Sequence, residues 1–163
     1  MTGPVKIREF RPEDLILIES QDEQDYLHTA FNTPHGIYEY GTGLLARAVL
    51  LSDGGQCAWT ALHDDGRVLG TGGVVYFTSH SGEAWLHLSK DFPKYARHII
   101  PKIKEQVDAI YLPRIQALTD VGFDRAERFI KYLGFQYEAT LEKYGPDQVD
   151  QKMWKIIKET KYG

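Results

Sequence analysis

The chain has 163 residues, of which 42% are hydrophobic and 26% charged, so it is long enough for one domain with a core of its own. The net charge of -4 gives no support for broad electrostatic binding of nucleic acid. Cys57 is the only cysteine, which excludes a disulfide within the chain and a zinc site built from several cysteines.

The distribution of apolar residues gives expectations for location and domain number. The first residues, MTGPVKIREF, contain no long apolar run, and every apolar stretch is far shorter than the roughly 20 residues that span a membrane. The chain has no internal repeat and no low-complexity linker. We therefore expect a soluble, cytoplasmic protein with a single domain over residues 1–163.

The N-terminal third predicts one strand and two helices. Apolar and charged residues alternate over 5–10, which is typical of a short strand. Pro12 is then expected in the first turn of a helix, and the two acidic residues that follow it suit the positive end of the helix dipole. Residues 31–43 contain proline, glycine and several aromatic residues and are expected to form a loop, followed by a short apolar helix over 44–51.

A hairpin is the clearest feature of the middle of the chain. Strands are expected over 56–63 and 68–78, joined by the turn Asp64-Asp65-Gly66. The next strand, over 83–88, is expected to be central because neither of its faces is strongly polar. The stretch Gly70-Thr71-Gly72-Gly73 lies inside a strand and opens no helix, so it indicates a bulge or a close backbone approach rather than a dinucleotide site.

The next segment predicts a helix and a strand. The apolar residues of the helix keep helical spacing: Tyr95, Ile99, Ile100, Ile103 and Val107. Ser89 or Asp91 is expected to cap it. Pro101 either kinks this helix or begins a second one. A strand then follows and ends at Asp120.

The last helix has the strongest periodicity in the sequence. Its apolar stripe has the spacing i, i+3, i+4, i+7 and consists of Ala126, Phe129, Ile130 and Leu133. Asp124 and Glu127 form a start close to a capping box, and Gly134 suits the C-terminal cap. Strands over 135–143 and 152–157 complete an α/β layer fold with a mixed sheet.

The segment Arg125–Phe135, which reads RAERFIKYLGF, resembles the helix-to-strand segment of the GNAT family of N-acetyltransferases. Residues 137–147 are similar to the closing hairpin of that family, and the order of the remaining elements agrees. The resemblance implies a mixed, mainly antiparallel sheet of about six or seven strands flanked by about four helices. It also implies an acetyl-CoA-dependent N-acyltransferase that acts on an unidentified amine.

GNAT enzymes bind acetyl-CoA between two central strands and need a base for the amine and an acid for the leaving thiolate. The resemblance places the base at Glu83, for which a solvated turn residue is the alternative. Tyr137 and Tyr144 are the candidate acids, with half-buried strand aromatics as the alternative. The family's tyrosine falls on Ile130, which cannot donate a proton. The loop expected to shape the acceptor pocket carries His35, Tyr38, Glu39 and Tyr40.

The stretch that corresponds to the family's phosphate-binding loop reads LSKDFPKYARHI and contains no glycine. Its cations can still attract a phosphate, whereas a capped helix with ordinary exposed cations is the alternative reading. The family's asparagine falls on Phe123, and a shift of one residue places Asp124 there. The expected cofactor contacts are Leu88, Ser89, Lys90, Lys94, Tyr95, Arg97, Phe123, Asp124 and Ala126.

Two non-catalytic hypotheses stand beside the enzyme. The pattern is also similar to small GNAT-like proteins of tailed bacteriophages, including the internal virion protein A family, which implies a structural or host-binding role in the host cytoplasm or the virion. A protein that retains CoA without turnover is the other hypothesis. The expected partners are a small-molecule or protein amine, or a virion or host protein, with a homodimer left open and with neither nucleic acid nor membrane involved.

Overall fold

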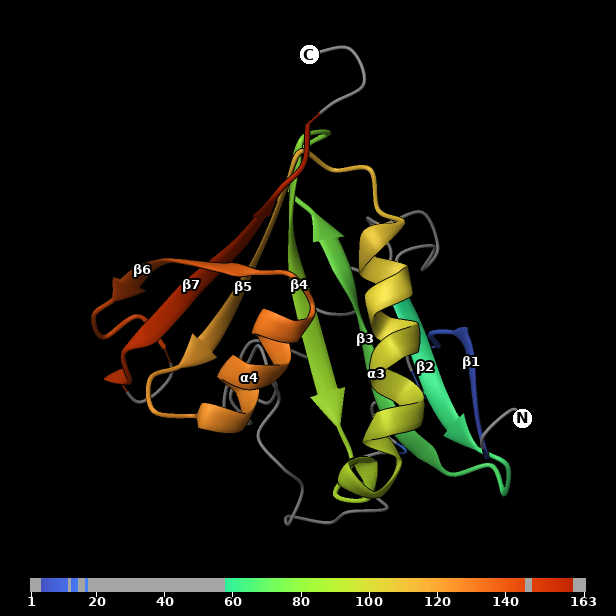
Figure 1. The fold of residues 1–163 in the computed structure, drawn as a ribbon. Coiled ribbons are helices and arrows are strands. Elements are labelled where there is room, and N and C mark those ends of the chain that lie inside the picture. Colours follow the sequence, from blue (N-terminus) through green and yellow to red (C-terminus); the bar gives the residue numbers. More distant parts are fainter. Residues whose placement is uncertain (1–3, 12, 15–16, 18–57, 146–147, 160–163) are drawn as a thin grey trace.

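The computed structural model describes residues 4–11, 13–14, 17, 58–145 and 148–159, which form a twisted sheet with two helices over one face (Figure 1). The strands are β1 (Val5–Glu9), β2 (Ala58–His63), β3 (Val68–Tyr76), β4 (Ser81–Leu88), β5 (Arg114–Asp120), β6 (Gln136–Leu141) and β7 (Gln151–Ile157), and the helices are α3 (Phe92–Asp108) and α4 (Asp124–Tyr132). The sheet order is β1-β2-β3-β4-β5-β7-β6, and only β4 and β5 are parallel neighbours. The predicted mixed, mainly antiparallel sheet is confirmed.

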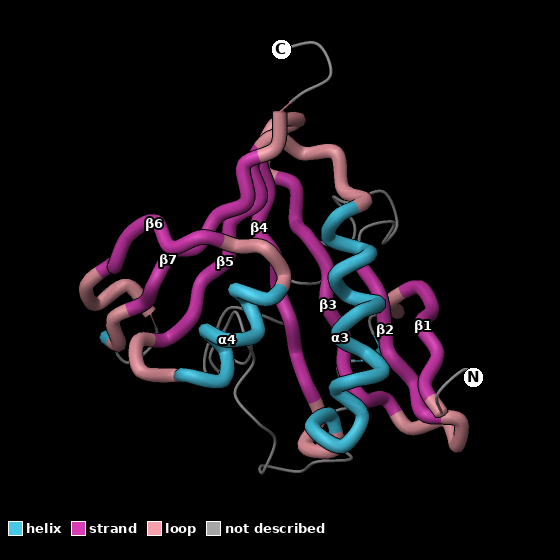
Figure 2. The backbone as a smooth tube through the Cα atoms, viewed as in Figure 1, coloured by secondary structure: helices cyan, strands magenta, loops and turns pink. Residues whose placement is uncertain are grey.

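The two central strands pair only at their beginnings. Ser81–Glu83 of β4 lies opposite Arg114–Gln116 of β5, and the register ends there. Beyond these residues the strands diverge, and α4 lies in front of the space between them (Figures 1 and 2). We call the point just after Glu83 and Gln116 the fork. Within the described part of the chain, β4 pairs only with β3 and β5 only with β7 from the fork onward, so each has one edge with no described strand beside it.

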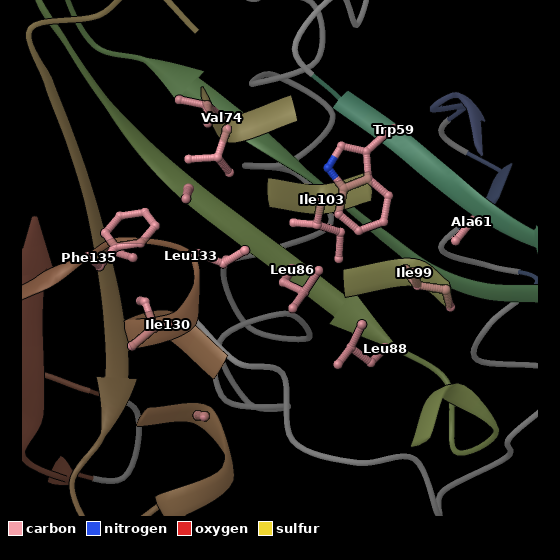
Figure 3. Close-up of a cluster of buried hydrophobic side chains, with 14 of the residues drawn as sticks. Trp59, Ala61, Val74, Leu86, Leu88, Ile99, Ile103, Ile130, Leu133 and Phe135 are labelled. Carbon is pink, nitrogen blue, oxygen red and sulfur yellow. The ribbon is translucent and has the colours of Figure 1, made fainter. Parts of the chain in front are cut away.

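The main core lies between the sheet and the two helices. Helix α3 packs Ile99 and Ile103 against the sheet, and α4 contributes Ile130, each of them at most 2% exposed. Figure 3 shows Leu133 beside β4, the strand that carries Leu86 and Leu88. Ile130 and Phe135 belong to the same core cluster. Because side chains alternate along a strand, the even-numbered residues of β4 face this core. The odd-numbered residues, including Glu83, lie on the opposite face.

The hairpin between β2 and β3 forms as expected. Gly66 takes a φ of +94°, and His63 and Arg67 are hydrogen-bonded across the turn. Inside β3, a Cβ built on Gly72 would lie 2.5 Å from the ring of Trp59. Gly72 therefore serves a close approach of side chain to backbone, as the glycine-rich stretch predicts, and the Trp59 ring covers this part of the sheet.

Helix ends differ from expectation in detail. Helix α3 is continuous through Pro101, so no second helix begins there. Neither helix has a side-chain cap: Asp91 and Phe123 occupy the N-cap positions without a capping hydrogen bond, and Glu127 pairs with Lys152 of β7 instead of closing a capping box. Among the described residues, no helix has the length and apolar character needed to cross a membrane.

The sequence predicts that Asp14 interacts with the dipole of the first helix, but it is the centre of a buried hydrogen-bond network instead. Asp14 is 0% exposed and accepts two hydrogen bonds from the Arg8 guanidinium at 2.9 and 2.8 Å. The hydroxyl of Thr60 donates to the same carboxylate at 2.6 Å, and the backbone N–H of Arg11 does so at 2.9 Å. Burial works to raise the pKa of Asp14, but these hydrogen bonds outweigh it and the pKa is lowered. The remainder of the expected N-terminal helices and the loop over 31–43 lie outside the described residues.

Candidate active site

A chain of hydrogen-bonded polar side chains, partly buried, runs from β4 to β5 at the fork. Glu83 is the last residue of β4 that pairs with β5, and its carboxylate accepts a hydrogen bond of 3.1 Å from Nε2 of Gln116. The Oε1 atom of Gln116 in turn accepts a hydrogen bond of 3.2 Å from Nε of Arg114. Because Arg114 occupies the amide oxygen, the amide NH₂ group is directed at Glu83. The carboxylate is therefore held in place at the fork.

The outer end of this chain is a bidentate ion pair. Both terminal nitrogens of Arg114 contact Glu138 of β6, at 2.9 and 2.6 Å, and Lys155 lies 3.3 Å from the same carboxylate. The hydrogen bond from Arg114 lowers the pKa of Glu138 to about 2. Glu138 thus stays ionised and compensates the positive charge of Arg114. The Arg114 charge therefore stabilises the ionised form of Glu83 less than an unpaired arginine would.

Glu83 has the electrostatic environment of a general base. Burial raises the pKa of Glu83, and the Gln116 hydrogen bond opposes the shift without cancelling it. A carboxylate with a raised pKa binds a proton more strongly than an exposed one, and general-base efficiency follows that affinity. The alternative of a solvated turn residue is wrong, since Glu83 lies within β4 and is hydrogen-bonded.

In the turn from β4 into α3, backbone N–H groups are already hydrogen-bonded to carbonyl groups of the same turn. The backbone N–H groups of Phe92 and Lys94 donate to the carbonyls of Ser89 and Asp91, at 3.1 Å each. The Asp91 carboxylate lies beside this helix end and pairs with Arg67 at 2.6 Å, so an anion bound here would meet an acidic side chain and a guanidinium that is already engaged. The N-terminus of α3 is therefore a poorer phosphate cradle than a glycine loop.

The expected cofactor residues around this turn are spread over several environments. Leu88 is buried over Gly70, and Ser89 is buried with its hydroxyl accepting the Asp91 N–H at 3.2 Å. Lys90 and Lys94 are exposed. Tyr95 packs edge-on against His63, with ring centroids 4.9 Å apart, on the side of α3 away from α4.

An arginine-lined groove separates the exposed sides of α3 and α4. Its volume is about 540 Å³, and its lining consists of Arg97, Ile100, Pro101, Arg125, Arg128, Phe129 and Tyr132. All three arginines are exposed, and none forms an ion pair with an acidic residue in the part of the chain that the structure describes. We call this feature the arginine groove. Its positive charge and apolar sides suit an anionic ligand with an aromatic part.

The α4 residues expected at the cofactor divide between core and surface. Ala126 is 3% exposed within the core, Phe123 is half-buried at the helix start, and Asp124 is exposed in the first turn. Ile130, at the position of the family's tyrosine, is 0% exposed and lies in the main core (Figure 3). The position is therefore buried in the core, and its side chain has no proton to donate.

The two candidate acids lie away from Glu83. Tyr137 is opposite Trp154, which is opposite Ala117 of β5, so Tyr137 shares the helix-covered face whereas Glu83 is on the other. Two strand spacings separate it from β5, about 10 Å. Its hydroxyl is hydrogen-bonded to Thr140 at 2.7 Å, and its ring packs edge-on against Trp154. Tyr144, 61% exposed, follows β6.

His87 adds a buried titratable group on the face of Glu83. Burial lowers the pKa of His87 from 6.5 to about 4. In the unfolded chain His87 is protonated near pH 6.5, whereas in the folded chain it is protonated only near pH 4. Protonation therefore favours the unfolded state, and folding stability falls as the pH drops through this window.

We expect this histidine to cost on the order of 3 kcal/mol of stability between pH 7 and pH 4. Urea unfolding of the wild type and of His87→Gln at both pH values measures it. The wild type should lose more stability than the variant by about that amount; equal losses would show that His87 titrates normally.

Sequence reasoning missed four residues of the site: Arg114, Gln116, Arg125 and Arg128. On α4, Arg125, Arg128 and Tyr132 share one face at i, i+3 and i+7, a signal that could have revealed the groove. No comparable signal exists for Arg114 and Gln116, because their role depends on the register between β4 and β5. The expected acceptor-loop residues His35, Tyr38, Glu39 and Tyr40 lie outside the described residues.

The fold is similar to that of solved acetyltransferases. It superposes on the ribosomal-protein-S5-alanine acetyltransferase from Vibrio fischeri with a TM-score of 0.67 at 17% identity, over 96% of this chain and 94% of the other. A putative acetyltransferase from Acinetobacter baylyi gives a TM-score of 0.69 at 15% identity, over 98% and 96%.

The spermidine N-acetyltransferase from Vibrio cholerae, in complex with CoA and spermine, gives 0.63 at 14% identity, over 94% and 95%. The chain has the GNAT fold. No protein-family model matches the sequence, and no curated protein matches it significantly.

Proposed function

We propose that this GNAT-fold protein is an acetyl-CoA-dependent N-acyltransferase that acetylates an amine. The observation that carries the proposal is the fork: β4 and β5 pair over three residues only, and a partly buried, hydrogen-bonded carboxylate stands at the last of them. An open strand edge can bind an extended, amide-containing ligand by main-chain hydrogen bonds. The fork thus combines a binding edge for a pantetheine arm with a candidate base.

The proposed reaction is direct transfer. Acetyl-CoA supplies an activated acyl group as a thioester; the amine nitrogen forms the new C–N bond, the C–S bond breaks, and the products are an amide and the free CoA thiol. Glu83 takes the proton that the amine loses, with Gln116 fixing the carboxylate. Tyr137 and Tyr144 are the proposed sources of the proton for the thiolate, and Tyr137 is the better placed because it lies on the helix-covered face.

The proposed contacts to the cofactor's phosphates differ from those of a glycine-rich loop. In this chain the arginine groove supplies positive charge between α3 and α4, and the turn before α3 has its N–H groups engaged locally. Guanidinium groups bind phosphates through charge-assisted hydrogen bonds that are stronger than neutral ones. Arg97, Arg125 and Arg128 are therefore the proposed contacts for the cofactor's phosphates, with Lys90 and Lys94 as weaker contributors.

Calorimetry with acetyl-CoA tests both the function and this contact set. We expect binding by the wild type, and replacement of Arg125 and Arg128 together by Gln should weaken it by about 10-fold to 100-fold, in line with about 1.5–3 kcal/mol for hydrogen bonds to charged groups. Lys102→Gln, which removes a charge from α3 outside the groove, is the matched control and should bind as the wild type does.

Failure of acetyl-CoA to bind at millimolar concentration would contradict the proposal. Transfer is then followed as release of CoA thiol with spermidine, spermine and an alanine peptide, the acceptor types suggested by the names of the structural neighbours.

The non-catalytic alternative has one observation in its favour. Ile130 occupies, within the core, the position where the family carries a proton-donating tyrosine. A GNAT-fold protein of bacteriophage or other origin that had lost turnover would bind no acetyl-CoA, or would bind it and release no thiol with any amine. The same calorimetry and thiol assay separate these outcomes.

A further inference from the structure

An apolar cavity lies between the C-terminal half of α3 and the sheet. Its volume is about 240 Å³, and its deeper wall consists of Val74, Ala84, Ile103, Val107 and Leu133, each at most 6% exposed. Gln106 and Tyr111 lie at its rim, and Tyr111 is 97% exposed. The cavity therefore joins a buried apolar interior to the surface.

This cavity adjoins the fork. Ala84 is the residue of β4 directly after Glu83, where pairing with β5 ends, and as an even-numbered residue it faces the helices. Leu133, at the end of α4, also borders the cavity and lies between α4 and β4 in Figure 3. A thioester carbon held at the fork on this face would have its acyl substituent beside Ala84, at the cavity's wall.

The cavity is far larger than a methyl group requires. A void of about 150 Å³ with aliphatic and aromatic walls holds a benzene molecule in another protein. The volume here, about 240 Å³, exceeds that. Among the described residues no charged side chain lines it, so an acid or a sugar would lose its solvation there without compensation from them.

We propose that this cavity receives the acyl group of the donor and that the preferred donor is a medium-chain acyl-CoA rather than acetyl-CoA. The proposal rests on the acyltransferase function above and specifies its donor. The transfer remains balanced in the same way: the C–S bond of the thioester breaks, the C–N bond forms with the amine, and the CoA thiol leaves. Only the acyl chain attached to the carbonyl carbon is longer, and on binding it moves from water into contact with the apolar wall of the cavity.

A series of donors tests the proposal. Acetyl-, butyryl-, hexanoyl- and octanoyl-CoA are titrated into the wild-type protein, and transfer to the same amine panel is measured by thiol release. We expect affinity to rise about fourfold for each added methylene until the cavity is full, which is the fold-change equivalent to about 0.8 kcal/mol. Equal or falling affinity from acetyl to hexanoyl would overturn the proposal while leaving an acetyltransferase intact; no binding of any donor would overturn both.

Variants of Val107 locate the effect. Val107→Phe fills the cavity and should reduce the hexanoyl-to-acetyl ratio of affinities toward one, whereas Val107→Ala should keep or raise it. Val121→Phe, at an exposed valine after β5, is the matched control and should keep the wild-type ratio. If folded Val107→Phe keeps the wild-type ratio of hexanoyl-CoA to acetyl-CoA affinity, the acyl chain binds outside this cavity and the proposal is overturned. Should that variant not fold, the wild-type series and Val107→Ala still decide.

Discussion

Replacing Glu83 by Gln is expected to lower kcat/KM for acyl transfer by about 10²-fold to 10⁴-fold, the range that general-base catalysis contributes. The amide keeps the shape of the carboxylate and can still accept the hydrogen bond from Gln116, but it cannot take a proton from the amine. Binding of acyl-CoA should change little, since it depends on the other face of the sheet. The measurements are thiol-release kinetics and calorimetry on the same preparation.

The pH dependence and a control sharpen this test. Because the pKa of Glu83 is raised above 4.5, the active carboxylate forms only as the pH rises through that higher value, and kcat/KM should rise with it. The variant should lack this rise. Glu142→Gln, at an exposed residue after β6, should retain the wild-type rate and profile. A Glu83→Gln enzyme with normal rates would remove Glu83 from the mechanism.

Replacing Asp14 by Ala is expected to cost about 3 kcal/mol of folding stability, the lower end of the range for removing one partner of a buried ion pair. The lower end applies because Arg8 is 26% exposed and regains some solvent contact, whereas Thr60, 0% exposed, loses its partner outright. Urea unfolding at pH 7 measures the loss. Asp65→Ala, which breaks an exposed pair with Arg67, is the matched control and should cost several times less.

The sign of the pH effect distinguishes this carboxylate from His87. The folded pKa of Asp14 lies below 3.8, so its stabilisation is complete above that value and is lost as the pH falls through the folded pKa. The difference between wild type and Asp14→Ala should therefore be constant near neutral pH and shrink in strong acid. A difference under about 1 kcal/mol at pH 7 would show that the network contributes no more than a surface pair.

The sequence alone determined the elements in which local rules dominate. Alternation and the Asp64-Asp65-Gly66 turn predict β2 and β3, and the i, i+3, i+4, i+7 stripe with Gly134 after it predicts α4. Gly134 has a φ of +102°, which disfavours a side chain and ends the helix where the pattern stops. The same segment carries the resemblance that led to the GNAT fold.

The tertiary structure decided how residues from distant segments combine. Glu83 and Gln116 are 33 positions apart and meet only through the short parallel register at the fork. Asp14 and Thr60 are separated by 46 positions, and their contact turns a residue expected at a helix end into a buried acceptor. Sequence periodicity reports which side of an element is apolar, but it does not report which strand lies beside it. The polar chain, the arginine groove and the cavity beside Ala84 all depend on that pairing and on where two strands part.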